Sequence, residues 1–347
     1  MTKKILVARG GKLSPFSGFG STHDALVERL TDARVEGYKL GKIAEYDLQA
    51  SPLRRVWRRW YSHPKVVESL TGSHDIVHIT DQEQAGLTPR NGKSIVTVHD
   101  LFHLYPSTRH GVAVGELKPG LIRKKDIRKV KEGIRRASLL ICISKYTQEE
   151  CEMRFPGIPT AWVPHAIDLN KYQKKTQRSE WFSEGVNLLI IGSEEPRKRV
   201  EFAVEVCGGI DVTLHKLGAE SSPDARRRIE ALANEVDCKL NWVGQVDSDE
   251  KIAALQYADA LLFPSIAEGF GLPPLEAYAA GTIALVADAP AHNEIPLEQH
   301  ILPHDDVEMW RAAIDELEDE ADAVKARAEE FSIEKWAERL KAAYDSL

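Results

Sequence analysis

Residues 264–288 read PSIAEGFGLPPLEAYAAGTIALVAD, and this stretch predicts a strand, a tight turn and a helix in succession. The strand-like run ALLFPS ends here, and a glycine-rich turn follows it. Pro273 and Pro274 suit the first turn of a helix, and Gly281 is a natural helix end. Such a succession is typical of a parallel α/β sheet, and it directs the amides of the helix N-terminus into the space beyond the sheet.

Two carboxylates flank this turn. Glu268 precedes the glycines and Glu276 lies one to two turns into the predicted helix, so the two side chains would bracket a ligand without touching each other. Helix amides bind anions, and carboxylates accept hydrogen bonds from sugar hydroxyls. A plain connection with two solvated glutamates is the alternative, but a plain turn needs only one glycine. The pattern therefore favours a site for a phosphorylated or sugar-bearing ligand.

The rest of the chain alternates apolar, strand-like runs with amphipathic helical stretches. The strand-like runs are KILVA, DIVHIT, SIVTVH, LLICIS, NLLIIG, VTLHKLG, KLNWVG, ALLFPS and IALVAD. This alternation indicates an α/β protein with parallel sheets, and a length of 347 residues favours two domains. The polar stretch 168–185 interrupts the alternation. We expect domains at 1–170 and 171–330, and a helix over 331–347 that docks on the first domain.

Several segments together resemble the retaining glycosyltransferase family 4. Glu268 and Glu276 match its E-x7-E motif. The further segments similar to family motifs are IGSEEPRKRVEFAVE (191–205), VPHAID (163–168), CISKYTQEE (142–150), VHDLFHLYP (98–106) and SGFGST (17–22). The resemblance implies the GT-B fold, in which two Rossmann-like domains face each other and a C-terminal helix packs back across them.

The resemblance also implies a role for each matching residue. Glu276 would bind the ribose hydroxyls of the donor, while Glu268 and the amides of residues 270–272 would hold the transferred sugar. Lys198 and Arg197 would neutralise the diphosphate as it leaves. The implied catalytic residues are His99, Lys198 and Glu268, and the implied donor-binding residues are Gly20, Arg197, Lys198, Gly269, Phe270, Gly271, Leu272 and Glu276.

Some of these assignments have a structural alternative. Arg197 and Lys198 could be solvated at a helix N-terminus, although the helix dipole disfavours cations there. His99 follows the strand-like run SIVTV and could cap a turn, whereas the resemblance makes it a neutral partner of the transferred sugar. Gly20 belongs to a lone G-x-G, which is weak evidence by itself. The chain also departs from the family pattern, because a serine follows Gly192 where many members have an arginine.

A D-x-D pattern at Asp247 and Asp249 raises the question of a metal ion, which such a pair holds in other glycosyltransferases. The segment DSDEKIAALQ is better explained as an N-cap followed by the acidic first turn of a helix. We therefore expect no cofactor and no essential metal.

Charge is divided unevenly along the chain. Residues 1–175 hold 30 Lys and Arg against 18 Asp and Glu, and the remainder holds 16 against 35, so the net charge of −7 divides into +12 and −19. A basic half is typical of a region that meets an anionic partner. Two runs concentrate the positive charge, LRRVWRRW (53–60) and IRKKDIRKVKEGIRR (122–136).

The run 53–60 combines arginines with tryptophans. A regular helix there would place one apolar face opposite the arginines, as in helices that lie on anionic membranes. The residues expected at the membrane are Arg54, Arg55, Trp57, Arg58, Arg59 and Trp60. Packing of this stripe on the first domain, with solvated arginines, is an equally good interpretation. Nucleic acid is not expected as a partner, because the tryptophans are not interleaved for base stacking.

These observations predict a hexosyltransferase that moves a mannose- or glucose-type hexose from a UDP- or GDP-sugar, with retention, to a hydroxyl of a glycan or lipid-linked acceptor at the membrane surface. The alternatives are a non-catalytic GT-B accessory subunit and, less favoured, a glycoside hydrolase or phosphorylase-like enzyme. A hydrolase binds no nucleotide, so the anion-binding amides of residues 269–272 and the cations Arg197 and Lys198 would have no ligand to bind. We expect a cytoplasmic protein, peripheral on the inner face of the membrane, since no signal peptide or spanning run is evident.

Overall fold

The computed structural model describes residues 2–12, 18–47 and 51–347. The chain forms two compact units. The first comprises Met1–Ser107, Gly115–His165 and Glu334–Leu347, and the second comprises Thr108–Val114 and Ala166–Ile333. Each unit is built on its own parallel sheet of six strands, so the predicted α/β class with two parallel sheets is confirmed.

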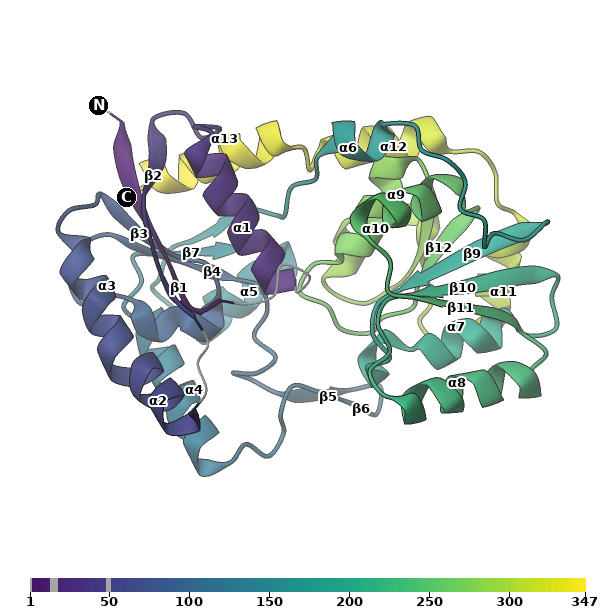
Figure 1. Ribbon diagram of the computed structural model, residues 1–347, viewed down its shortest axis with the longest axis horizontal. Helices are drawn as coiled ribbons and strands as arrows, with labels where there is room; N and C mark the ends of the chain where they lie inside the picture. Colours follow the sequence, from purple (N-terminus) through teal and green to yellow (C-terminus); the bar gives the residue numbers. More distant parts are fainter. Residues whose placement is uncertain (1, 13–17, 48–50) are drawn as a thin grey trace. The chain divides into compact units, whose positions relative to one another are not determined.

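The sheet of the first unit has the strand order β2-β1-β3-β4-β7-β8 (Figure 1). Its strands are β1 (Lys3–Gly11), β2 (Tyr38–Tyr46), β3 (Ile76–Ile79), β4 (Ser94–Val98), β7 (Leu139–Cys142) and β8 (Thr160–Trp162). The inner strands β3 and β7 are buried along their whole length. Burial on both faces explains why their sequences are almost continuously apolar. Neighbouring strands are parallel, with Val77 opposite Ser94 and Val96 opposite Leu140.

Helices of the first unit cover this sheet. They are α1 (Gly18–Thr31), α2 (Pro52–Trp57), the π-helix η1 (Arg58–Ser62), α3 (His63–Thr71), the 3-10 helix η2 (Gln82–Leu87), α4 (Leu121–Ile134), α5 (Lys145–Arg154) and α13 (Ile333–Asp345). Helix α13 joins this unit from the far end of the sequence. The hydroxyl of its Tyr344 lies 2.8 Å from Nδ1 of His78 on β3, and the Tyr38 hydroxyl donates to Asp345 Oδ1 at 2.7 Å.

The sheet of the second unit has the order β11-β10-β9-β12-β13-β14. Its strands are β9 (Val186–Ile191), β10 (Val212–Leu217), β11 (Lys239–Gly244), β12 (Ala260–Phe263), β13 (Ile283–Ala287) and β14 (Ile301–Leu302). The chain first adds strands on one side of β9 and then returns to add β12 on its other side. This reversal creates a switch point, where open α/β sheets bind ligands beyond the carboxyl ends of the strands.

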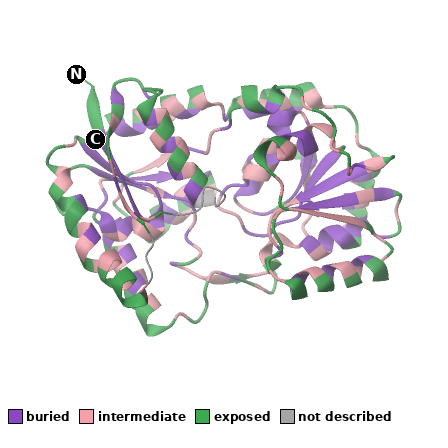
Figure 2. Ribbon diagram, in the orientation of Figure 1, coloured by how far each residue is buried: buried purple, intermediate pink, exposed green. Residues whose placement is uncertain are grey.

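Helices again connect these strands. They are α6 (Leu169–Gln173), η3 (Pro196–Lys198), α7 (Val200–Val206), α8 (Pro223–Glu235), α9 (Ser248–Tyr257), α10 (Leu272–Ala280), η4 (His292–Glu294), η5 (Glu298–His300), α11 (Val307–Asp315) and α12 (Ala321–Glu329). Figure 2 shows that buried residues follow the strands, whereas exposed residues lie on the outer sides of the helices. None of the described helices combines the length and the apolar character that crossing a bilayer requires.

All nine strand-like runs of the sequence form strands, but the division of the chain differs from the expected ranges. The first unit ends at His165, before residue 170, and helix α13 is part of it. Residues 108–114, which hold most of the hairpin of β5 (Ser107–Arg109) and β6 (Val112–Val114), group with the second unit. Strand β2 was not predicted, because Lys39, Lys42 and Glu45 interrupt its apolar residues and the strand forms a sheet edge.

Candidate functional site

The candidate site lies in the second unit, at the carboxyl ends of β9 and β12. The segment after β9 carries Arg197 and Lys198 on η3, and the segment after β12 carries Glu268. Both segments leave the sheet at the switch point. Hydrogen bonds join them directly, since the backbone N–H of Ile266 donates to the carbonyl of Arg197 at 2.9 Å.

Helix α10 begins at this edge as the sequence predicted. Gly271 is its N-cap with a φ of +108°, a left-handed conformation that disfavours any side chain. A Cβ at Gly271 would also lie 2.6 Å from the Cβ of His292, which explains why glycine is required there. Pro273 occupies the first turn, and Gly281 ends the helix with a φ of +92°. Pro273 and Pro274 carry no N–H, so the backbone donors that this end of α10 offers an anion are those of Leu272 and of the turn before it.

Glu268 is the centre of an ion-pair cluster. Its Oε2 lies 2.8 Å from Nη1 of Arg197, and its Oε1 accepts a hydrogen bond from Nζ of Lys198 at 3.1 Å. Burial alone would raise the pKa of the Glu268 carboxyl, but the charges of Lys198 and Arg197 outweigh burial and lower this pKa to about 2. Glu268 is therefore a permanent carboxylate, and the two cations are held beside it instead of being solvated.

A buried ion pair fixes the segment between β9 and η3, which leads to Arg197 and Lys198. The ammonium group of Lys216, on β10, contacts the carboxylate of Glu194, and both side chains are fully buried. The backbone N–H of Ser221 donates to the same carboxylate, while the backbone N–H of Glu194 donates to the Ser221 hydroxyl at 3.2 Å. Glu194 directly follows Ser193, the residue that stands where many family members have an arginine. This loop is therefore fixed by an ion pair that the sequence analysis did not identify.

Glu276 faces the site from one turn into α10, and two side chains hold it. The Tyr172 hydroxyl donates to Glu276 Oε1 at 2.8 Å, and Lys251 Nζ donates to the same oxygen at 2.6 Å. Burial and then the charge of Glu276 raise the pKa of Tyr172 far above its ordinary value, so the hydroxyl is always a donor. Neither residue was predicted from the sequence, because Tyr172 lies 104 positions and Lys251 lies 25 positions from Glu276.

The remaining residues of the predicted turn have different surroundings. Phe270 is buried, and its ring packs edge-on against Phe331 with centroids 5.9 Å apart, so only its backbone can contact a ligand. Gly269 and Leu272 are half-buried. His292 is fully buried behind the loop of Glu268, and burial lowers its pKa to about 4, which keeps the ring neutral.

The first unit holds the other two predicted site residues. His99 follows β4 and is buried, with Nε2 2.9 Å from the carbonyl oxygen of Thr80, and burial lowers its pKa to about 4. Its ring is neutral, as the resemblance implies. Gly20, an implied donor-binding residue, lies within the first turn of α1, which begins at Gly18. Ser17, the first residue of the predicted glycine motif, lies outside the described residues.

The predicted amphipathic stripe at residues 53–60 is only partly correct. Helix α2 ends at Trp57 and a π-helix follows, which rotates the later residues. Arg59 and Trp60 therefore both turn to Asp126 on α4, through Arg59 Nε at 2.7 Å and Trp60 Nε1 at 2.9 Å. They do not line a common outer surface with Trp57, which stays 59% exposed.

The D-x-D pattern is an N-cap, as predicted. The Asp247 carboxylate accepts hydrogen bonds from the backbone N–H groups of Asp249 and Glu250, at 2.9 and 2.8 Å, and thereby starts α9. Within residues 2–12, 18–47 and 51–347, no three His, Cys, Asp or Glu side chains gather as a set of metal ligands.

Comparison with known proteins shows which proteins this chain is similar to. Residues 172–332 match the family of glycosyl transferases group 1. This range covers nearly all of the second unit. The whole chain has the GT-B fold of such enzymes: HepE from Anabaena, solved in complex with UDP-glucose, superposes with a TM-score of 0.73 at 14% identity, covering 99% of this chain and 100% of HepE.

Two curated relatives are mannosyltransferases. The O-antigen chain mannosyltransferase RfbU of Salmonella typhimurium is 23% identical over 258 residues, which are 67% of this chain and 67% of RfbU. The phosphatidyl-myo-inositol mannosyltransferase of Mycobacterium tuberculosis is 25% identical over 173 residues, which are 47% of this chain and 45% of that enzyme. The match thus covers less than half of the mycobacterial relative.

Proposed function

We propose that this protein is a retaining, metal-independent hexosyltransferase that uses a UDP- or GDP-sugar of the mannose or glucose type. The observation that carries the proposal is the cluster of Glu268, Arg197 and Lys198 beside the N-terminus of α10. Cations and helix amides at one edge suit a diphosphate, and a permanent carboxylate suits sugar hydroxyls. The mannosyltransferase relatives and the UDP-glucose bound to HepE support this donor class.

Each side chain has a separate task in this proposal. Lys198 and Arg197 neutralise the diphosphate and stabilise the negative charge that develops on it as the glycosidic bond breaks. Glu268, with the amides of residues 269–272, positions the hexose, and His99 donates or accepts one hydrogen bond to it. Glu276 binds the ribose hydroxyls through Oε2, because Tyr172 and Lys251 both occupy Oε1. The leaving diphosphate itself takes the acceptor proton, so no carboxylate nucleophile is needed.

The charge state of Glu268 argues against glycoside hydrolysis. A hydrolase needs one carboxyl group that is protonated near neutral pH and acts as the acid. A pKa of about 2 makes Glu268 unable to fill that role. Glu276 Oε1 is already engaged by the ammonium group of Lys251 at 2.6 Å.

For the acceptor, we propose a glycan or a lipid-linked sugar at an anionic membrane surface. Leu53 and Trp57 on α2, and Leu121 and Ile122 at the start of α4, are 83%, 59%, 84% and 66% exposed. Arg54 and Arg55 lie between Leu53 and Trp57 in sequence and are also exposed, whereas Arg58 is half-buried. Exposed apolar side chains beside arginines suit the headgroup layer. The names of the two mannosyltransferase relatives refer to an O-antigen chain and to phosphatidyl-myo-inositol, a glycan and a lipid.

Thermal unfolding with nucleotide-sugars tests the donor proposal. A donor at 100 times its Kd is expected to stabilise the protein by about 2.7 kcal/mol. Glu276→Ala should lose this shift, whereas Glu235→Ala, an exposed glutamate at the end of α8, should keep it. The donor assignment is wrong if no UDP-, GDP- or ADP-sugar shifts the wild type, or if both variants respond equally.

Co-sedimentation with anionic vesicles at low salt tests the acceptor surface. Leu121→Ser should weaken binding because Leu121 is almost fully exposed and contributes nothing to the core. Met153→Ser, which alters another exposed apolar side chain of the same unit, serves as the control. A wild-type protein that ignores the vesicles would refute membrane attachment without affecting the donor assignment.

A further inference from the structure

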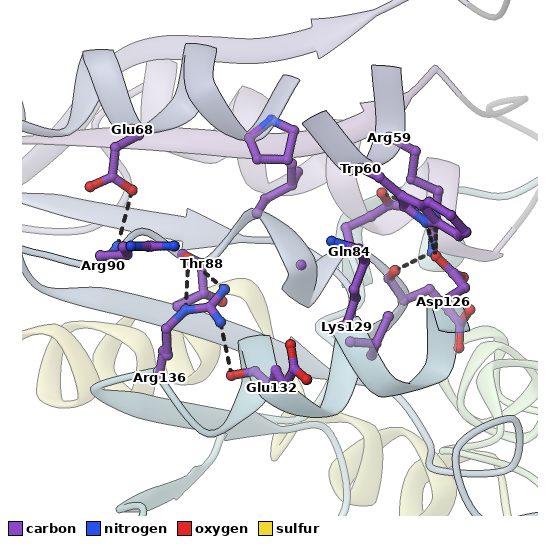
Figure 3. A pocket seen from close by; sticks show the side chains of 15 residues that line it. Arg59, Trp60, Glu68, Gln84, Thr88, Arg90, Asp126, Lys129, Glu132 and Arg136 are labelled. Carbon is purple, nitrogen blue, oxygen red and sulfur yellow. Dashed lines mark hydrogen bonds and ion pairs between the residues drawn. The ribbon is translucent and has the colours of Figure 1, made fainter. Parts of the chain in front are cut away.

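The first unit contains a cavity that the proposed function does not use. Parallel strands such as β3 and β4 are usually joined by an α-helix that covers the sheet, but here only the 3-10 helix η2 makes the crossover. The space that a longer helix would fill remains open between α3 and α4, as a cavity of about 240 Å³ (Figure 3). Gly133 lets α4 lie against η2, since a Cβ there would overlap the carbonyl oxygen of Ala85.

At one end of this cavity the charged side chains are paired with each other. Asp126 accepts hydrogen bonds from Nε of Arg59 at 2.7 Å, from Nη1 of Arg123 at 2.8 Å and from Nε1 of Trp60 at 2.9 Å. Arg59 also donates to the carbonyl of Glu83 at 2.7 Å. These side chains satisfy each other, so this end has no evident need of a ligand.

At the opposite end the cavity is lined by Arg90 and Arg136 together with Glu68 and Glu132, but neither arginine forms an ion pair with a described residue. Arg136 donates to the carbonyl oxygens of Thr88 at 3.0 Å and Glu132 at 3.2 Å, both neutral acceptors, and forms no ion pair with a described residue. Arg90 lies beside it, and Figure 3 shows both at the same end of the cavity. The carboxylate of Glu68 binds the backbone N–H of Arg90 at 3.0 Å.

Two further features show that this end lacks a partner. The Thr88 hydroxyl is buried and has no hydrogen-bond partner among the described residues, which costs free energy unless a ligand supplies one. Burial lowers the pKa of the Arg136 guanidinium group, and the charge of Arg90 lowers it further. The charges of Glu132 and Glu68 raise this pKa but do not reverse the change. An anion between the two guanidinium groups would relieve both problems at once.

We propose that Arg90, Arg136 and Thr88 bind the phosphate group of a small phosphomonoester. Guanidinium groups form paired hydrogen bonds with phosphate oxygens, and the Thr88 hydroxyl can donate a further one. The cavity is smaller than the about 300–1,000 Å³ typical of sites for drug-sized ligands, so it suits a phosphate with little attached.

The position of this site separates it from the proposed chemistry. Thr88 and Arg90 precede β4, and Arg136 precedes β7, so they lie toward the amino-terminal edge of the first sheet. His99, in contrast, follows β4 at the carboxyl edge. A phosphate at Arg90 and Arg136 would therefore bind at the opposite edge of this sheet from His99.

Phosphate titration of the full chain tests this proposal. Thermal unfolding is followed against inorganic phosphate at constant ionic strength, in a Lys198→Ala background that weakens phosphate binding at the proposed donor site. Arg90→Gln should weaken the remaining phosphate affinity about tenfold, the effect of losing one charge-assisted hydrogen bond. Lys93→Gln removes the same charge from an exposed position three residues away and should leave the affinity unchanged.

A second arm distinguishes the source of the phosphate. The same variants are sedimented with phosphatidylcholine vesicles that contain phosphatidic acid. An effect of Arg90→Gln on inorganic phosphate supports a free phosphorylated ligand, and an effect confined to the vesicles supports a lipid phosphate at the same residues. If Arg90→Gln and Lys93→Gln behave alike in both arms, the site does not exist. None of these results depends on whether nucleotide-sugars bind the second unit.

Discussion

Replacing Glu268 by glutamine measures the strength of the ion-pair cluster. The folded chain lowers the pKa of this carboxyl from 4.5 to about 2. At about 1.36 kcal/mol for each pH unit, the ionised form is favoured in the folded state by roughly 3 kcal/mol. The side chain is only 13% exposed, so solvent screens the interaction weakly. Glu268→Gln should therefore lower the free energy of unfolding by roughly 3 kcal/mol at pH 7.

The sign of the pH dependence follows from the direction of this pKa change. A lowered pKa means that the stabilisation is complete above about pH 4.5 and disappears as the pH falls toward 2. At pH 3 the difference between wild type and Glu268→Gln should shrink to roughly 1.5 kcal/mol. Urea unfolding at both pH values, with the m-value checked for constancy, measures this difference.

Glu195→Gln is the matched control. Glu195 lies 2.9 Å from Nε of Arg197, but its side chain is 53% exposed, and exposed pairs contribute about 0–1 kcal/mol. The reasoning fails if Glu268→Gln costs no more than Glu195→Gln at pH 7. It also fails if the cost of Glu268→Gln is the same at pH 3 as at pH 7.

Three further predictions concern the supports of the site. Lys216→Met should destabilise the protein by about 3–5 kcal/mol in urea unfolding because it leaves the Glu194 carboxylate buried without its partner, and adding Glu194→Leu should restore most of the loss. Gly271→Ala should abolish the thermal shift by nucleotide-sugars, whereas Gly157→Ala, with a φ of +89° but open space around it, should cost about 1 kcal/mol and keep the shift. Tyr172→Phe should raise the KM for the donor severalfold in steady-state kinetics with kcat unchanged, and a fall in kcat alone would contradict its positioning role.

The fold and the core of the site were predictable because they depend on local patterns. Gly271, Pro273 and Gly281 set the turn and both ends of α10 by their backbone preferences, which tertiary structure did not override. The buried strands are apolar on both sides, so their runs are unmistakable. Strand β2 lacks that signal, because it forms an edge and alternates polar with apolar residues.

Contacts between distant residues were not predictable in the same way. The spacing of residues 53–60 gives a helical face, but the partner of Arg59 is Asp126, 67 positions away. The π-helix that turns Arg59 and Trp60 inward has no signature in the sequence. From the sequence, Lys251 belongs only to the predicted first turn of a helix. Its hydrogen bond to Glu276 forms because α9 and α10 lie side by side, and the local sequence does not reveal that packing.

The location of α13 has a consequence for how the protein is made. His78 is buried in the first sheet and needs the Tyr344 hydroxyl, which the ribosome adds 266 residues later. Domains generally fold in the order of their synthesis, but here the N-terminal sheet cannot complete its core until α13 emerges. The second unit, whose residues end at Ile333, can finish folding first. During translation, His78 therefore lacks its Tyr344 partner until almost the whole chain has been made.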